Sequence, residues 1–355
     1  MKLVKGLLLT LGLFIVFMAL CIAGFLGYVT LAKYKPLPVS NLSIVKSSIV
    51  SQKDVTDTFK LLTWNIGYAG LGKEMDFFYE GGTMVRPTEA QCTGYLQHIL
   101  QTINKVDSAD FVFLQEVDAY SHRTYKIDEV AQVEDALPGY HRVFAKNYDV
   151  PFVPVPLREP MGRVEAGQMT LSKIVPDSAI RYALQGSYSW PKRLFLLDRC
   201  FIHTQFTLPS GKTLSLINLH NSAFSDAAEA RQMELDKIKK LMTDLYAKGQ
   251  YVIVGGDWNQ NPPQFNASLI KDGNKVYAFE HVPETFKPEG WNWAVDQSKA
   301  TNRNVNEAYL KGKTSTTIID YFLASPNVKV VSVNTIANGF ENSDHQPVVL
   351  KVKLK

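Results

Sequence analysis

The chain has 355 residues, of which 46% are hydrophobic and 20% charged, and its formal net charge is +4. That charge is too small to indicate the strongly basic surface of a typical nucleic-acid-binding domain, although a bound metal can supply positive charge locally. The three cysteines, Cys21, Cys92 and Cys200, form no CxxC pair, which argues against a disulfide framework and against a thiolate zinc site.

The N-terminal segment is predicted to cross a membrane. No side chain from Leu7 to Ala32 is charged. As a helix this run would be roughly 39 Å long at about 1.5 Å per residue, longer than a hydrocarbon core of about 30 Å. A cleaved signal peptide has an apolar region of only about 7–15 residues. We therefore expect a short tail over 1–6 and an uncleaved anchor over 7–32, with cleavage and secretion as the alternative.

The flanking charges say little about orientation, because Lys2 and Lys5 precede the apolar run while Lys33 and Lys35 follow it. A single anchor ahead of a large domain usually exports that domain. We expect a single-pass protein of the cell membrane with its domain outside the cytoplasm. Residues 33–57 are predicted to be a linker with some extended character, because prolines stop the helix and polar side chains keep the segment solvated.

Residues 58–355 form one compact pattern, in which apolar strand-like runs alternate with helical stretches. Helices are expected over 87–105 and about 226–248, where apolar residues recur at helical spacing. The proline-rich stretch over 147–160 is predicted to be a surface loop without regular structure. No membrane-inserting hairpin is obvious in this region.

Polar residues follow several apolar runs at the point where each is expected to end. In a layered sheet fold such strand ends can gather at one edge, where ligands bind. Converging polar groups would be costly to desolvate unless they bound something. The residues concerned are Asn65, Glu116, His220, Asn221, Asp257 and Asn259, joined late in the chain by Asp320, Asp344 and His345.

Most of these side chains offer oxygen ligands, which suit Mg²⁺, Mn²⁺ or Ca²⁺. Magnesium takes only one or two carboxylates and leaves room for a substrate phosphate. The histidines remain free to contact phosphate oxygens or to donate protons. Oxygen ligands together with two histidines therefore favour metal-assisted phosphoester hydrolysis.

Six short motifs resemble, in the expected order, those of the endonuclease/exonuclease/phosphatase superfamily: TWNIGY, LQEVD, NLHN, GDWN, IDYFLAS and SDHQPV. LHNSAFSDAAEA is similar to the histidine segment of pancreatic-type deoxyribonuclease, and GQMTLSK resembles a mid-chain strand of the superfamily. The resemblance covers roughly residues 59–353. It implies an α/β fold, a four-layered α/β sandwich in which two packed central β-sheets are flanked by helices.

The resemblance also implies roles for the site residues. Glu116 would be the main metal ligand, assisted by Asn65 and Asp344. Asp257 would orient or deprotonate the attacking water, and Asn259 would hold that water or the phosphate.

The remaining roles concern charge around the phosphate. His345, with Asp320 as its partner, would stabilise the pentacovalent phosphate, because a carboxylate partner favours the imidazolium. His220 would contact phosphate or protonate the leaving oxygen. Arg199 and Asn221 would contact substrate phosphate.

The expected function is a membrane-anchored, divalent-metal-dependent phosphodiesterase. Two alternatives concern the substrate: an extracellular nuclease acting on DNA or RNA, or a lipid head-group hydrolase like the sphingomyelinases and phosphoinositide phosphatases. A third is a non-catalytic binding module on the same fold, which the presence of Glu116, Asp257 and His345 disfavours. Expected partners are the phosphoester substrate and the membrane, and no obligate protein partner is inferred.

Overall fold

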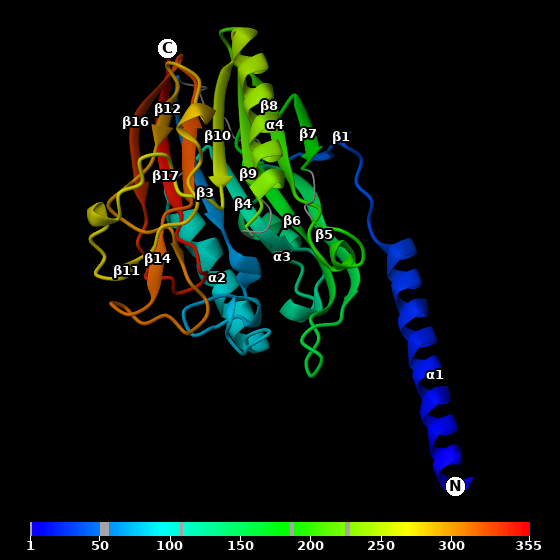
Figure 1. Cartoon of the computed structure of the whole chain (residues 1–355). Coiled ribbons are helices and arrows are strands. Elements are labelled where there is room, and N and C mark those ends of the chain that lie inside the picture. The colour runs from blue at the N-terminus through cyan, green and yellow to red at the C-terminus, as the bar shows by residue number, and fades with distance from the viewer. Residues whose placement is uncertain (1, 50–56, 107–108, 185–187, 224–227) are drawn as a thin grey trace.

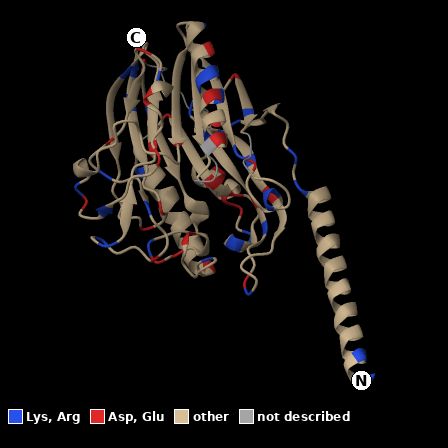
Figure 2. Cartoon of the chain, viewed as in Figure 1, with Lys and Arg blue, Asp and Glu red and all other residues tan. Residues whose placement is uncertain are grey.

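The computed structural model describes residues 2–49, 57–106, 109–184, 188–223 and 228–355. Helix α1 (Lys2–Ala32) projects from a layered domain (Figure 1). Within the described residues it alone is long and apolar enough to cross a membrane. It begins before the expected Leu7, because Lys2 to Gly6 continue the same helix. Its cations lie near its N-terminus, and no acidic residue accompanies them (Figure 2).

Two seven-stranded mixed sheets form the centre of the domain as described. In spatial order the first sheet comprises β1 (Val39–Asn41), β7 (Ser178–Ala183), β8 (Cys200–Thr207), β9 (Thr213–His220), β10 (Tyr251–Asp257), β15 (Asp320–Ala324) and β12 (Asn292–Ala294). The second comprises β16 (Val328–Thr335), β17 (Val348–Leu354), β3 (Thr58–Asn65), β4 (Phe111–Asp118), β6 (Gly162–Ser172), β5 (His141–Val153) and β2 (Ile44–Val45). A small third sheet joins β11 (Lys275–Val276), β14 (Ser315–Thr317) and β13 (Asn302–Arg303).

The main core lies between the two large sheets, where aromatic side chains interdigitate. Phe111 of the second sheet packs on Phe206 of the first with ring centroids 5.0 Å apart. Helices α2 (Glu89–Lys105) and α3 (Glu129–Ala136) cover the outer face of the second sheet, and α4 (Ala228–Ala247) covers that of the first. The predicted four-layered sandwich is confirmed. Short 3-10 helices complete the fold: η1 (Gly67–Ala69), η2 (Phe78–Glu80), η3 (His122–Thr124), η4 (Lys192–Phe195), η6 (Ala267–Leu269) and η7 (Glu284–Phe286).

The two predicted helices are observed. Thr88 caps α2 through a capping box with Gln91, which fixes its start within two residues of the predicted boundary. It buries Leu96, Ile99 and Ile103 at helical spacing. Helix α4 is described from Ala228, and the expected start near residue 226 lies outside the described residues.

The expectation of an irregular loop over 147–160 is wrong in its first half. Strand β5 continues to Val153, which pairs with Gly162 of β6, so the hairpin tip spans only residues 154–161. The register shifts between Val150 and Val153, around Pro151. A proline is tolerated in a strand at such a bulge because no ladder hydrogen bond is required of it there.

The linker is also more structured than a solvated tether. Strand β1 pairs with β7, and β2 pairs with β5, so this short segment closes an edge of each large sheet. Leu42 and Ile44 pack against a buried cluster that includes Val143 and Ile202. Covering the edges protects their unpaired backbone groups from association with other chains.

Candidate active site

Strand register brings the predicted polar residues to one edge of the sandwich. Asp257 ends β10 opposite His220 of β9 and opposite Asp320 of β15. In the second sheet Asn65 ends β3 beside β4, the strand that carries Glu116. The two sheets therefore deliver their strand ends to a common site.

Glu116 occupies an unusual position within its strand. The register of β4 against β6 shifts between Leu114 and Val117, and Glu116 has φ 53°. A left-handed backbone is strained for a glutamate and tends to persist at functional sites. The bulge re-aims the carboxylate toward the cluster at the strand ends.

Four predicted residues meet around Asp257. Its Oδ2 lies 3.4 Å from His220 Nε2 and 3.8 Å from His345 Nε2. His220 Nε2 also lies 3.8 Å from Glu116 Oε1. Asn65 Nδ2 donates to both carboxylates, at 3.0 Å to Asp257 and 3.3 Å to Glu116.

His345 and Asp320 form a buried pair, with Nδ1 and Oδ2 separated by 2.8 Å. Burial opposes the charged form of His345, but Asp320, Asp344 and Asp257 outweigh it and raise its pKa well above the ordinary value. Asp320 therefore fixes the orientation of the ring through Nδ1, and the acidic surroundings favour the charged form of the imidazole.

His220 behaves in the opposite way. Burial, with Arg199 and His345 nearby, lowers its pKa well below the ordinary value. A neutral imidazole at this position can donate one hydrogen bond to a phosphoryl oxygen. Its lowered pKa makes it a poor source of a full proton, so of the two expected roles contact with phosphate agrees better with this direction.

Two buried carboxyl groups of the site, those of Asp257 and Asp344, have pKa values above the ordinary value. Burial raises the pKa of Asp257 to about 6, with His345 opposing the shift and Asp320 adding to it. Burial also raises the pKa of Asp344, where His345 lowers it and Glu116 raises it. Carboxylates that raise one another's pKa in one cavity form an oxygen-rich environment that a hard divalent cation would neutralise.

The donors of the site suit a hard cation by their chemistry. Asp257, Asp320 and His345 offer ligand atoms within 4.8 Å of one another, but Asp320 and His345 are already paired. Glu116 and Asp344 both line the cavity, and Glu116 raises the pKa of Asp344. Their carboxylate oxygens are the kind of ligand that a hard cation prefers. Asn65 Nδ2 donates to the carboxylates of Asp257 and Glu116, and its Oδ1 accepts from the Gly67 N–H at 3.0 Å.

Asn259 is hydrogen-bonded to both Asp257 and Asn221. Asn259 has φ 51°, its N–H donates to Asp257 Oδ1 at 2.9 Å, and its Nδ2 donates to the Asn221 carbonyl at 2.8 Å. Asn259 lines the cavity of the site, whereas Asn221 does not. Both polar side-chain atoms of Asn221 are buried without a partner among the described residues. Asn221 therefore lies beside the cavity, and its contact with substrate phosphate stays a prediction.

The site opens into a cavity of about 440 Å³. Four buried polar atoms of its lining residues have no hydrogen-bond partner among the described residues: Tyr68 Oη, Asn147 Nδ2, Arg199 Nη1 and His220 Nδ1. The first three are hydrogen-bond donors, and the role of His220 Nδ1 depends on the tautomer. Buried donors without partners are costly unless a ligand supplies acceptors.

The sequence reasoning identified Arg199 but missed Tyr68 and Asn147. Tyr68 has φ 42° and ψ 36° within η1, a strained conformation for a tyrosine. Arg123 lies 3.6 Å above its ring and is itself held by Asp118 at 2.8 Å. Tyr68 is the last residue of the TWNIGY motif, so its place in that motif was the available signal. Nothing in the sequence singles out Asn147.

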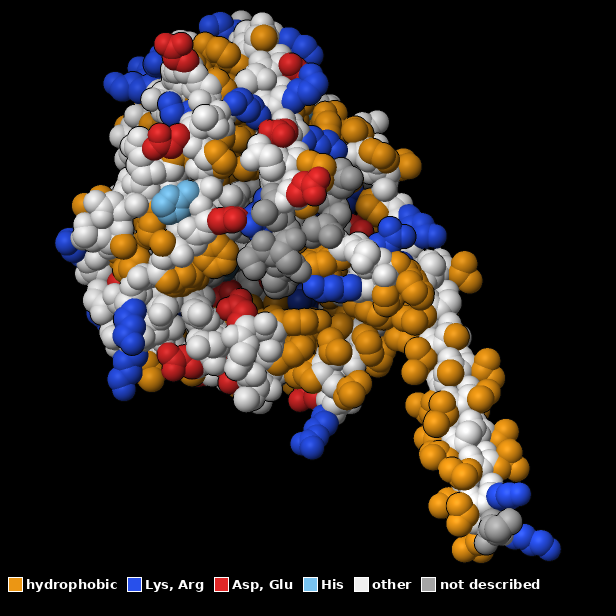
Figure 3. Space-filling model, viewed as in Figure 1, with side chains coloured by type: hydrophobic (Ala, Val, Ile, Leu, Met, Phe, Trp, Pro, Cys, Tyr) orange, Lys and Arg blue, Asp and Glu red, His pale blue; other side chains and the backbone are white. Residues whose placement is uncertain are grey.

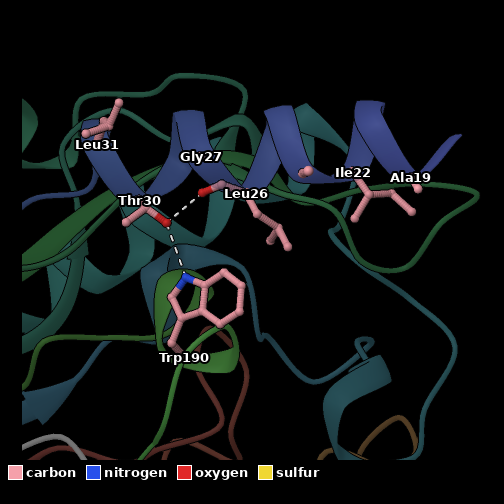
Figure 4. A pocket seen from close by; sticks show the side chains of 8 residues that line it. Ala19, Ile22, Leu26, Gly27, Thr30, Leu31 and Trp190 are labelled. Carbon is pink, nitrogen blue, oxygen red and sulfur yellow. Dashed lines mark hydrogen bonds between the residues drawn. The ribbon is translucent and has the colours of Figure 1, made fainter. Parts of the chain in front are cut away.

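A second, larger hollow lies between α1 and Trp190 (Figure 4). Among the described residues its lining contains no ionisable side chain, and its side-chain hydrogen bonds join Trp190 Nε1 to Thr30 Oγ1 and Thr30 Oγ1 to the Leu26 carbonyl. It runs along the predicted membrane helix, where lipid would fill it. The chemistry belongs to the first cavity.

Comparison with known proteins agrees with this geometry. The profile of the Endonuclease/Exonuclease/phosphatase family matches residues 62–345. A search of curated proteins found no match. An endonuclease/exonuclease/phosphatase from Beutenbergia cavernae is similar in structure, with TM-score 0.53 and 17% identity, covering 84% of this chain and 72% of its own.

Two other solved structures are similar over most of their length. The human Nocturnin catalytic domain with bound sulfate has TM-score 0.51 and 17% identity, covering 88% of this chain and 98% of its own. ANGEL2, described as a 2',3'-cyclic phosphatase, has TM-score 0.55 and 14% identity, covering 90% and 99%. At these identities the likeness establishes the fold alone. The family profile spans most of the chain, and the protein belongs to the endonuclease/exonuclease/phosphatase family.

Proposed function

We propose that this protein is a membrane-anchored phosphodiesterase that hydrolyses phosphoesters with a divalent cation. The observation that carries the proposal is the cluster around Asp257, in which two histidines and Glu116 meet beside partnerless buried donors. A charged His345, a neutral His220 and acidic oxygens in one cavity match the needs of in-line water attack on phosphorus.

Glu116 and Asp344 would hold the cation, and Asn65 would assist through the lone pair of its amide oxygen that does not accept from the Gly67 N–H. Mg²⁺ is the first choice and Mn²⁺ or Ca²⁺ the alternatives, because the ligands are hard oxygens. When bound, the cation would polarise the phosphoryl oxygens and neutralise the charge that develops there.

Three side chains of the cavity would supply the proton acceptor, the positive charge and a hydrogen-bond donor. Asp257, whose pKa is raised to about 6, orients the attacking water and accepts its proton, with Asn259 bonded to the same carboxylate. The His345 imidazolium, positioned by Asp320, faces the charge that builds on the phosphate. His220 donates a hydrogen bond to a phosphoryl oxygen.

Arg199 and Tyr68 supply further donors for the non-bridging oxygens, since both residues line the cavity and neither Arg199 Nη1 nor Tyr68 Oη has a partner in the described part of the chain. Burial raises the pKa of Tyr68 well above its ordinary value, against the opposing effect of Arg123. The phenol therefore keeps its proton and can donate it in a hydrogen bond. Asn221 is proposed to hold Asn259 through its carbonyl.

We further propose that α1 anchors the protein in the cell membrane, with residues 1–6 on the cytoplasmic side, the linker 33–57 after it and the domain 58–355 outside. The 31 residues of α1 support this, since they exceed the length that a membrane requires. Recovery of a soluble protein that lacks residues 1–32 would favour the signal-peptide alternative instead.

A test of the activity uses the full-length protein in detergent micelles, with Mg²⁺ or with excess chelator. Plasmid DNA, RNA, sphingomyelin, phosphoinositides and a chromogenic phosphodiester are offered side by side. We expect metal-dependent cleavage of at least one, lost in Asp257→Asn and kept in Asp244→Asn, an exposed aspartate paired with Lys240 on α4. Metal binding without cleavage of any substrate would favour the binding-module alternative.

A further inference from the structure

We propose that the edge of the domain drawn lowest in Figure 1 contacts the membrane that α1 crosses. We propose also that the active-site cavity opens toward this bilayer. The substrate would then be a phosphodiester carried by a lipid of the same membrane. The substrate class rests on the proposed function, whereas the membrane contact does not.

The end of α1 is fixed to the domain rather than loosely tethered. Phe25 stacks on Phe195 at 6.0 Å and meets Phe152 edge-on at 6.1 Å. Lys33 forms an ion pair with Asp198 at 3.2 Å and donates to the carbonyls of Arg193 and Leu196. The orientation of α1 therefore restricts the orientation of the domain on the membrane.

The segment that holds α1 is also a wall of the active-site cavity. Phe195 contacts α1, and the next two residues, Leu196 and Leu197, line the cavity together with Arg199. Only a few residues thus separate the point where α1 leaves the membrane from the phosphate donors. The cavity lies close to the level of the bilayer surface.

The β5–β6 hairpin has an apolar tip that points toward the proposed membrane. The tip extends alongside α1 toward the side on which the N-terminus lies (Figure 1). Leu157 at this tip is 88% exposed, and Phe152 of the same hairpin is exposed as well, so apolar surface continues along the hairpin rather than standing at a single residue. The only acidic residue of the tip, Glu159, is paired with Arg86 at 3.1 Å, while Arg158 is exposed.

These features form one surface, which we call the membrane-facing edge: Phe152, Leu157 and Trp190, with the exposed bases Arg158 and Arg193. Figure 3 shows hydrophobic side chains gathered on the lower edge of the domain and continuous with those of α1. An aromatic and a leucine flanked by cations suit the interface of a bilayer, where rings and basic groups meet lipid head groups. The continuity with α1 favours a lipid surface over a protein partner.

The cavity wall itself suits an amphiphile. Phe77, Met161, Leu196 and Leu197 provide apolar surface beside the charged cluster. A lipid phosphodiester could leave its acyl chains in the bilayer while its head group enters the cavity. A long polymeric phosphodiester would gain little from this lining.

The contact is measured with the full-length chain in phosphatidylcholine vesicles, with and without bromine on the acyl chains. Bromine quenches only tryptophans that lie in the bilayer. The reporter is Leu157→Trp in a Trp190→Phe background, because the other four tryptophans, Trp64, Trp258, Trp291 and Trp293, are buried or partly buried. Val331→Trp in the same background is the matched control, since Val331 is 50% exposed on β16.

We expect brominated lipid to quench the Leu157→Trp emission and to leave the Val331→Trp emission unchanged. Equal emission of the Leu157→Trp reporter with both lipids would overturn the membrane-facing edge. Quenching of both reporters equally would overturn it as well, because the whole domain would then be associating with lipid.

The substrate class is tested with Leu157→Glu and Val331→Glu. Leu157→Glu should lower hydrolysis of vesicle lipid by about tenfold and leave that of a water-soluble chromogenic phosphodiester unchanged. Val331→Glu should alter neither. Hydrolysis of the soluble compound alone by the unmodified protein would contradict the lipid substrate. Hydrolysis of neither compound would contradict the proposed function, but it would not affect the quenching result.

Discussion

Asp320 Oδ2 lies 2.8 Å from His345 Nδ1, and both side chains are buried at the edge of the sandwich. Because the pKa of His345 is raised by Asp320 and its acidic neighbours, the imidazolium form extends to higher pH. Its contribution to stability is fully present below the unfolded pKa of about 6.5 and is lost as pH rises through the folded pKa.

Asp320→Asn should therefore shift the alkaline limb of the kcat/KM profile toward lower pH. It should also reduce kcat at neutral pH by about 10²-fold, as expected for a lost preorganised charge near the phosphate. The profile is measured from pH 5 to 10. An unmoved alkaline limb would mean that Asp320 does not set the charge of His345.

Asp257 is expected to set the acid limb. Its pKa is raised to about 6, so the carboxylate that accepts a proton from water is lost as pH falls through that value. Asp257→Asn should lower kcat by roughly 10²- to 10⁴-fold. Unfolding of the variant, followed by circular dichroism, separates loss of the base from loss of the fold. A wild-type rate that stays flat down to pH 4.5 would contradict this assignment.

Tyr68 is expected to bind substrate without stabilising the fold, because its hydroxyl has no partner among the described residues. Tyr68→Phe should raise KM by roughly tenfold, the value of one hydrogen bond to a charged group. The free energy of unfolding should not fall.

Tyr140→Phe is the matched control for this tyrosine. The Tyr140 hydroxyl donates to the Ala109 carbonyl at 2.6 Å, outside the cavity. Its removal should lower the free energy of unfolding by about 1 kcal/mol and leave KM unchanged. If both variants affected stability alone, Tyr68 would have no role in substrate binding.

Divalent cations should stabilise the protein through Glu116 and Asp344. A ligand that binds only the folded state raises Tm with its concentration, so Mg²⁺ should raise Tm and chelator should reverse the shift. Glu116→Gln should abolish the shift, whereas Glu159→Gln at the hairpin tip should retain it. A full shift in Glu116→Gln would exclude Glu116 as the main ligand.

The resemblance to the superfamily implied the layered fold, and polar residues at strand ends predicted most of the cluster. Apolar runs ending in Asn65, Glu116, His220 and Asp257 can bring those ends to a common edge, and the structure brings these residues together. Periodicity was sufficient to locate α2, whose start the structure shows capped by Thr88.

The remaining features depend on contacts between distant segments. The Tyr68 ring is directed by Arg123, and Asn147 reaches the cavity through the pairing of β5. Asn221 matched a strand-end pattern, and its carbonyl accepts from the Asn259 side chain. Such roles arise from tertiary packing, which neither hydrophobic periodicity nor short motifs encode.

The same limitation explains why β1 and β2 escaped prediction. Each is too short to show a periodic pattern, and each forms only by adding to an existing sheet edge. Their loss should destabilise a domain that lacks α1. A chain beginning at Lys46 should have a Tm lower, on the order of 10 °C, than one beginning at Lys35. Differential scanning calorimetry of the two chains measures this, and Ile44→Glu in the longer chain should reproduce part of the decrease. Equal Tm values would show that residues 39–45 only tether the domain.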